Sequence, residues 1–183
     1  MKNNSVKTIV AIGIGAALFF VLARFVAIPS PVPNTNICIQ YGLLAFMAAM
    51  FGPVAGALIG LIGHVLADFS MYGSIWWSWV IASAAFGAMV GLVSKKLHIA
   101  DGEFGKKDIV VFNVFQVISH AVAWVLIAPV LDILMYAEPA NKVFLQGFVA
   151  GAANIVTTAI VGTLLCVAYA SARPKKGSLK EEK

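Results

Sequence analysis

The sequence predicts an all-α integral membrane protein, a compact bundle of six transmembrane helices in a single domain with both termini in the cytoplasm. Of its 183 residues, 61% are hydrophobic and only 11% are charged, and the mean hydropathy is +0.92. A soluble domain is about 45–50% apolar and about 25% charged, so this chain has too few polar side chains to cover a water-soluble globule. The composition also excludes a disordered chain, and having only two cysteines excludes a disulfide-rich secreted scaffold.

Six apolar segments that approach or exceed the length of a membrane span follow one another along the chain. They are expected at residues 6–28, 37–51, 53–69, 75–93, 108–134 and 143–172. A cluster of three prolines ends the first segment, and Gly52-Pro53 separates the second from the third. A hydrophilic loop at 94–107 precedes the fifth segment, and a charged cytoplasmic tail at 173–183 follows the sixth.

The distribution of basic residues distinguishes six spans from an alternative of five, in which the second and third segments merge. With six spans and a cytoplasmic amino terminus, eleven of the thirteen Lys and Arg residues are cytoplasmic, and only Arg24 and Lys142 are not. Five spans would divide the basic clusters between the two sides, against the bias toward positive cytoplasmic loops. The net charge of +5 therefore indicates topology, and we expect no nucleic-acid partner.

Small residues recur at intervals of four along several expected helices, which permits close contact between helix backbones in lipid. The relevant positions are Ala11, Gly13, Gly15 and Ala17 in the first helix and Gly56 and Gly60 in the third. Most of these positions are expected to pack inside the bundle. For the first helix, contact with a second membrane subunit is an alternative that the sequence leaves open.

Aromatic and amide side chains gather at the end of the bundle that the charge bias places outside the cell. Three of the four tryptophans lie within four residues, more than one helix needs as an interfacial anchor. Two of them, Trp76 and Trp79, share a helix face, which suits stacking on a flat ligand. The proline-rich loop after the first helix is stiff, uncharged and rich in amides. We expect this loop to cover a pocket that opens outward.

A second group of candidate residues lies on the last two expected helices. His120 and Trp124 share one face of the fifth helix, and Gln146 and Asn154 lie on the sixth. Hydrogen bonds between the two helices would satisfy these side chains, and lining a ligand cavity is the alternative use. The predicted binding residues are Asn34, Asn36, Gln40, Tyr41, Tyr72, Trp76, Trp79, His120, Trp124, Gln146 and Asn154.

Ionisable residues within the expected spans are few. His64 and Asp68 share a face of the third helix, and with His120 they would make a conceivable two-His, one-carboxylate set, but nothing in the spacing demands a metal, so none is predicted. Asp68 is expected to order the following loop or to pair with Arg24. The sequence has no phosphate-binding P-loop, HExxH motif or nucleophile elbow. We therefore expect no enzymatic activity, no catalytic residue and no cofactor.

The third expected helix begins with the run Phe51-Gly52-Pro53-Val54-Ala55-Gly56-Ala57-Leu58-Ile59-Gly60, and Asp68 follows it. This run resembles the FGPxxGxxxG…D pattern of the substrate-binding S components of energy-coupling-factor (ECF) vitamin transporters. The size and the six expected spans are also similar to that family. The pair Ala11 and Gly15 resembles the family's AxxxA surface, with glycine in place of the second alanine.

The resemblance implies a subunit that binds its vitamin from outside and lies in the bacterial plasma membrane as a multi-pass protein. It implies docking through Ala11, Gly15, Gly56 and Gly60 on a transmembrane T subunit, which two ABC ATPases accompany. ATP would then be used by these partners and not by this chain. Moreover, residues 34–41 are similar to a subgroup that includes a lactobacillal cobalamin S component.

Cobalamin or its precursor cobinamide is therefore the expected vitamin, and riboflavin or another vitamin is the alternative. A stand-alone secondary transporter is the alternative class of protein. Secondary transporters often contain inverted repeats and several charges near the membrane midplane. This chain has no convincing internal repeat and few such charges, which favours the S component.

Overall fold

The computed structural model describes residues 2–173, and the rest of the predicted tail, 174–183, lies outside the described residues. The helices are α1 (Lys2–Phe25), α2 (Gln40–Phe51), α3 (Pro53–Tyr72), α4 (Trp77–Gly91), α5 (Lys106–His120), α6 (Ala128–Tyr136) and α7 (Ala140–Ser171). A π-helical segment, η3 (Ala121–Ile127), joins α5 to α6. Two short 3-10 helices, η1 (Leu92–Lys95) and η2 (Ile99–Asp101), follow α4.

Among residues 2–173, five helical segments are apolar and long enough to cross a membrane. They are Ser5–Phe25, Pro53–Tyr72, Trp77–Lys95, Lys106–Tyr136 and Ala140–Ser171. The shorter apolar helix, α2, has 12 residues and rises roughly 18 Å at about 1.5 Å per residue, less than the hydrocarbon core of about 30 Å. The predicted helical fold is confirmed, whereas six full spans and the cytoplasmic side of the termini stay predictions.

The helix ends on both sides of the loop between α1 and α2 differ from the expected bounds. There, β1 (Ile28–Pro29) and β2 (Asn36–Ile37) pair as antiparallel strands. Because these residues are extended, α1 ends before residue 28 and α2 begins after residue 37. The fourth helix begins at Trp77 and not at residue 75, and the fifth span contains the π-helical segment η3.

The helices α2 and α3 are separate and antiparallel. They meet at Gly52, whose φ of 89° is a conformation that L side chains rarely adopt. Pro53 follows in the first turn of α3, where its missing N–H leaves no helix bond unmade. A Cβ built on Gly56 would lie 2.7 Å from the Cβ of Ala48. The segment 37–69 is therefore not the single long helix of the five-span alternative.

Glycines bring α3 and α4 into backbone contact. A Cβ on Gly56 would lie 2.3 Å from the carbonyl oxygen of Gly87, and a Cβ on Gly87 would lie 2.2 Å from that of Gly56. One turn further along α3, a Cβ on Gly60 would lie 2.5 Å from the carbonyl oxygen of Ser83. Side chains at these positions would force the two helices apart.

The four residues predicted for docking lie inside the bundle. Ala11, Gly15, Gly56 and Gly60 are all buried by other residues of the chain. Gly15 of α1 faces Ile59, whose Cδ1 would be 2.7 Å from an added Cβ. These four positions therefore pack helices of this chain together. Among the glycines and alanines of α1, Gly13 and Ala17 are the exposed ones.

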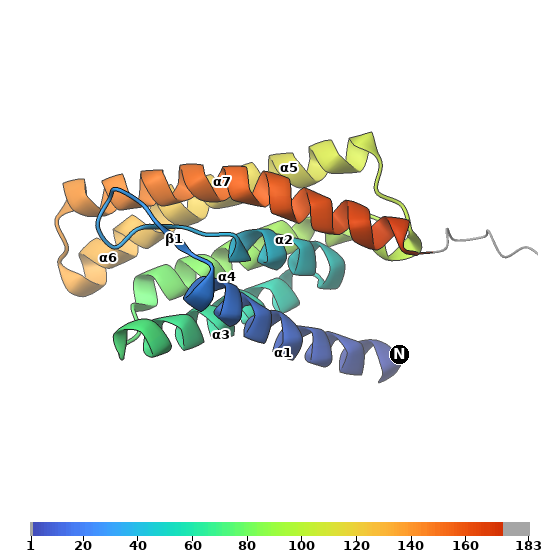
Figure 1. The fold of residues 1–183 in the computed structure, drawn as a ribbon, viewed down its shortest axis with the longest axis horizontal. Coiled ribbons are helices and arrows are strands. Elements are labelled where there is room, and N and C mark those ends of the chain that lie inside the picture. The colour runs from blue at the N-terminus through green and yellow to red at the C-terminus, as the bar shows by residue number, and fades with distance from the viewer. Residues whose placement is uncertain (1, 174–183) are drawn as a thin grey trace, which may run out of the picture.

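The loops divide between the two ends of the bundle (Figure 1). The β1–β2 loop and the turns between α3 and α4 and between α6 and α7 lie at one end, here named the hairpin end. The start of α1, the α4–α5 connection and the end of α7 lie at the other. That opposite end carries the described basic residues Lys7, Lys95, Lys96, Lys106, Lys107 and Arg173. The charge bias predicts that it faces the cytoplasm.

The variant Gly56→Ala is expected to destabilise the bundle, because its new Cβ would collide with the Gly87 carbonyl oxygen. Overpacking of this kind typically costs about 1–3 kcal/mol. Thermal unfolding in detergent, followed by circular dichroism, should show a lower midpoint. Gly13→Ala is the matched control, because nothing lies within 4 Å of a Cβ built there. Equal midpoints for the two variants would contradict the α3–α4 packing.

Candidate binding cavity

A cavity of about 320 Å³ lies at the hairpin end, between the β1–β2 loop and the ends of the helices. Small-molecule sites generally occupy roughly 300–1,000 Å³, so this cavity lies at the lower end of that range. Its lining residues are Ala23, Ala27, Asn34, Thr35, Asn36, Cys38, Gln40, Tyr41, His64, Ala67, Asp68, Met71, Tyr72, Ser74, Trp76, Trp79, Trp124, Asp132, Glu138, Lys142, Gln146, Ala150 and Asn154.

All but one of the predicted binding residues line this cavity. They are Asn34, Asn36, Gln40, Tyr41, Tyr72, Trp76, Trp79, Trp124, Gln146 and Asn154. The exception, His120, is fully buried: its Nδ1 accepts the Trp124 indole N–H at 2.8 Å, and its Nε2 lies 3.0 Å from Thr158 Oγ1. His120 therefore links α5 to α7 through Thr158 and holds the indole of Trp124 through a hydrogen bond.

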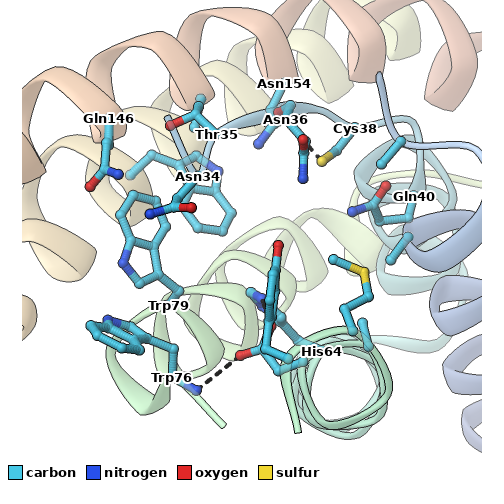
Figure 2. A pocket seen from close by; sticks show the side chains of 18 of the residues that line it. Asn34, Thr35, Asn36, Cys38, Gln40, His64, Trp76, Trp79, Gln146 and Asn154 are labelled. Carbon is cyan, nitrogen blue, oxygen red and sulfur yellow. Dashed lines mark hydrogen bonds and ion pairs between the residues drawn. The ribbon is translucent and has the colours of Figure 1, made fainter. Parts of the chain in front are cut away.

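Indole rings form one wall of the cavity. The rings of Trp79 and Trp124 are stacked, with centroids 5.7 Å apart and an interplanar angle of 22°. Tyr41 meets Trp124 edge-on at a centroid distance of 5.0 Å. Figure 2 shows Trp76, Trp79 and Gln146 on one side of the cavity, Gln40 on the other, and Asn34 and Asn36 reaching in from the loop. This arrangement offers a flat apolar surface with amides around it.

Trp124 lies within the irregular backbone of η3. A π-helix bonds each N–H to a carbonyl five residues back, and such segments are frequent at functional sites. Helix α7 approaches this backbone closely, because a Cβ on Gly147 would lie only 2.0 Å from the Trp124 carbonyl oxygen. A glycine at 147 is therefore required for α7 to close this side of the cavity.

The buried carboxylate of Asp132, on α6, fixes two of the tryptophans. The Trp76 Nε1–H donates to Oδ1 at 2.6 Å, and the Trp79 Nε1–H donates to Oδ2 at 2.8 Å. The Ser78 hydroxyl also donates to Oδ1. A buried carboxylate without such partners would cost several kcal/mol. The three donors thus hold the start of α4 against α6.

Asp132 is not among the predicted site residues, although a sequence signal for it exists. It lies within the 31-residue apolar segment Lys106–Tyr136. Ionisable side chains inside such segments are rare and mark functional sites by default. Applying that rule to every carboxylate within the expected spans would have included Asp132.

Asp68, on α3, organises the turn that leads into α4. Its Oδ2 accepts the backbone N–H of Trp76 at 3.0 Å, and its Oδ1 lies 3.3 Å from His64 Nε2. Of the two roles expected for Asp68, it has the first, ordering the loop. Arg24 lies instead over the ring of Phe25, 5.4 Å from its centroid.

A chain of hydrogen bonds continues from Asp68 into the core. His64 Nδ1 lies 2.6 Å from Ser83 Oγ, and the Tyr41 hydroxyl lies 3.0 Å from the same oxygen. A single assignment uses every donor: Tyr41 donates to Ser83, Ser83 donates to His64 Nδ1, and His64 Nε2–H donates to Asp68. In this assignment the imidazole of His64 is uncharged.

Helix α7 holds the loop that covers the cavity. The Gln146 amide Nε2–H donates to the carbonyl oxygen of Pro33 at 2.9 Å, and the Thr157 hydroxyl donates to that of Cys38 at 2.8 Å. Asn34 has a φ of 57°, a left-handed conformation that asparagine tolerates better than most residues. The loop therefore has a defined path over the cavity.

Two amides of the lining have unsatisfied oxygens. Gln40 and Asn154 are 4% and 2% exposed, and the structure gives neither Gln40 Oε1 nor Asn154 Oδ1 a hydrogen-bond partner. A buried polar group without a partner costs about 1–3 kcal/mol, so a bound polar molecule would stabilise this arrangement. Across residues 2–173, no group of three or more His, Cys, Asp or Glu side chains is placed to hold a metal ion.

The variant Asp132→Ala is expected to release the rings of Trp76 and Trp79, because their indole N–H groups lose their common acceptor. The near-ultraviolet circular dichroism of the tryptophans should weaken, and the loss of acceptor should cost about 1–3 kcal/mol of stability. Asp132→Asn keeps one acceptor oxygen and should give an intermediate spectrum. Glu103→Ala is the control, because it removes an exposed carboxylate in the segment between η2 and α5. An unchanged spectrum in Asp132→Ala would contradict this role.

Curated relatives match almost the whole chain. A UPF0397 protein of Enterococcus faecalis is 57% identical over 181 residues and covers 99% of both chains. A UPF0397 protein of Staphylococcus aureus strain Newman is 53% identical over 181 residues, which is 99% of this chain and 98% of the relative.

Two solved structures share the fold at low sequence identity. The S component for biotin from an ECF-type ABC transporter superposes with a TM-score of 0.65 at 14% identity, covering 91% of this chain and 92% of that one. FolT bound with folic acid gives 0.61 at 15% identity, covering 85% and 92%. The family model described as ECF-type riboflavin transporter, S component, matches residues 3–171. The chain therefore belongs to this family of ECF-type S components, which are membrane transporter subunits and not enzymes.

Proposed function

We propose that this chain is the vitamin-binding subunit of an ATP-driven uptake transporter in the bacterial plasma membrane, with the cavity at the hairpin end as its vitamin site. One observation carries the proposal. Side chains from α2, α3, α4, η3, α7 and the β1–β2 loop converge on one cavity, where the side-chain oxygens of Gln40 and Asn154 still lack hydrogen-bond partners. Concave, largely apolar sites with a few convergent polar groups are typical of small-molecule binding.

A flat, conjugated vitamin fits the shape of the cavity best. The stacked pair Trp79 and Trp124 supports a planar ring, and the volume of about 320 Å³ suits a molecule of flavin size. The description of the matching family names riboflavin. Riboflavin is therefore the candidate that the geometry favours.

Cobalamin, or its precursor cobinamide, is the second candidate. The resemblance of residues 34–41 to a cobalamin-binding subgroup supports it. The amides of Asn34, Asn36 and Gln146 line the cavity and are suited to the amide groups at the edge of a corrin. A corrinoid is several times larger than a flavin, so it would enter only in part and displace the β1–β2 loop. Both nitrogens of the lining imidazole, His64, are already engaged, so cobalt would keep its own axial ligands.

We further propose that a transmembrane T component with two ABC ATPases drives uptake. The exposed small residues Gly13 and Ala17 lie one turn apart on α1, and a partner helix could approach α1 closely there. The buried residues Ala11 and Gly15 would then contribute indirectly, because they pack α1 against the rest of the bundle. The sequence contains no phosphate-binding loop, so the work would come from the partners.

The variant Trp79→Ala is expected to weaken vitamin binding about tenfold or more, because it removes the apolar contact area of the indole as well as the roughly 0.5–1.5 kcal/mol that ring stacking adds beyond that area. The absorption spectrum of protein purified from cells fed both vitamins distinguishes a flavin from a corrinoid, and calorimetry then measures the affinity. Trp77→Ala is the matched control, since Trp77 is 43% exposed and does not line the cavity. Equal losses in both variants would place the site elsewhere.

The variant Gly13→Leu is expected to keep vitamin binding and to reduce ATP-driven uptake to background in vesicles that contain the T component and the ATPases. No atom of the described residues outside the helix's own backbone lies within 4 Å of a Cβ at position 13, so the leucine projects outward. Gly15→Leu, by contrast, should destabilise the fold by colliding with Ile59. Full uptake by Gly13→Leu would refute this docking face. Accumulation by the chain alone under a proton gradient would instead identify a secondary transporter.

A further inference from the structure

We infer that the cavity accepts a vitamin in its neutral or cationic form and rejects derivatives that carry a carboxylate or phosphate, because uncompensated carboxylates and unpartnered amide oxygens line it. This inference rests on the proposed function and names the chemical class of its substrate. It follows from the charges of the lining residues, from the hydrogen-bond partners of each carboxylate and from the two amide oxygens that have no hydrogen-bond partner.

Negative charge exceeds positive charge in the lining. The charged lining residues are Asp68, Asp132, Glu138 and Lys142. Glu138 and Lys142 form an ion pair of 2.6 Å, so their charges compensate each other. Among the lining residues that the structure describes, Lys142 is the only Lys or Arg side chain. Asp68 and Asp132 therefore face the cavity without a cationic partner of this kind.

The partners of Asp132 do not cancel its charge. An indole N–H can donate but cannot accept, so both carboxylate oxygens act as acceptors toward Trp76 and Trp79. These donors are uncharged, as is Ser78. Asp132 is only 2% exposed, so little water screens its charge from a molecule in the cavity.

The hydrogen-bond partners of Asp68 are also uncharged in the assignment given above. Its partners are the backbone N–H of Trp76 and the imidazole of His64. In the hydrogen-bond assignment that uses every donor from Tyr41 onward, His64 is neutral. Asp68 is 5% exposed. Both carboxylates are bonded to Trp76: Asp68 accepts its backbone N–H, and Asp132 accepts its indole N–H. A ligand anion beside Trp76 would thus face two carboxylates in poorly screened surroundings.

The buried amides provide an independent observation. Gln40 and Asn154 line the cavity, and the oxygen atom of each lacks a hydrogen-bond partner. A ligand N–H or O–H is the donor that these oxygens need. An ionised carboxylate or phosphate offers only acceptors. The amides and the carboxylates therefore favour the same kind of ligand, one rich in donors and free of negative charge.

The test uses two pairs of probes that share a ring system and differ in charge. Riboflavin is compared with flavin mononucleotide, and cobinamide is compared with cobyrinic acid. For the pair that binds, we expect the anionic member to bind at least about tenfold more weakly to the wild-type chain in detergent. Equal affinities would overturn the inference while leaving the receptor function intact.

The variant Asp68→Asn separates charge from size. Asparagine can accept the Trp76 N–H through its oxygen, and its NH2 group can donate to His64 Nε2 once the imidazole carries its hydrogen on Nδ1 and donates it to Ser83. The ratio of the dissociation constant of the anionic probe to that of the neutral probe should then fall by about threefold or more. Glu103→Gln, which changes an exposed carboxylate outside the cavity, should leave this ratio unchanged. A ratio that Asp68→Asn does not move would mean that size alone excludes the anion, and would overturn the inference.

If neither pair binds, riboflavin and corrinoids fail as ligands, which is a failure of the proposed function. Mass spectrometry of the molecule that copurifies with the chain then tests the inference separately. A molecule without carboxylate or phosphate would support it, and a molecule with either group would overturn it.

Discussion

The burial of one carboxylate determines how the cavity is built. Asp132 lies on α6 and is removed from water, and such a charge is tolerated only when donors surround it. Trp76, Ser78 and Trp79 supply these donors from the start of α4. Because Trp76 also donates its backbone N–H to Asp68 on α3, the same requirement connects three helices. The indole wall is therefore held by electrostatics at its edges and by ring packing at its faces.

Close backbone contacts give this wall a firm base. Glycines bring α3 against α4 through Gly56 and Gly87, and Gly147 brings α7 against η3 beneath Trp124. In lipid, helices gain little from hydrophobic burial against each other, so such contacts supply much of the packing energy. The cavity lies beyond these contacts, at the hairpin end, where loops and polar side chains take the place of helix packing. Its floor is thus rigid, whereas its cover is a loop.

Residue type and helix face predict most of this site, and depth along a helix explains the part they miss. The tryptophans and amides near the hairpin end could be recognised because aromatic and polar side chains are unusual there in such numbers. His120 shares a face with Trp124 but lies one turn deeper, where Thr158 and Trp124 occupy its nitrogens. Periodicity identifies a face and not the depth at which a cavity ends. Likewise, spacing alone cannot tell which small pair of α1 faces inward, since Ile59 on another helix determines it.

Helix α1 connects the two activities that the proposal requires. Its exposed positions Gly13 and Ala17 lie on the helix whose last turns include Ala23, a lining residue of the cavity. The strand β1 begins at Ile28, three residues after α1 ends, and leads directly into the loop over the cavity. A subunit that binds α1 would therefore act on the helix to which this loop is attached. Displacement of α1 would pull on the loop while Gln146 and Thr157 hold it to α7, so docking and opening of the cavity would be mechanically coupled.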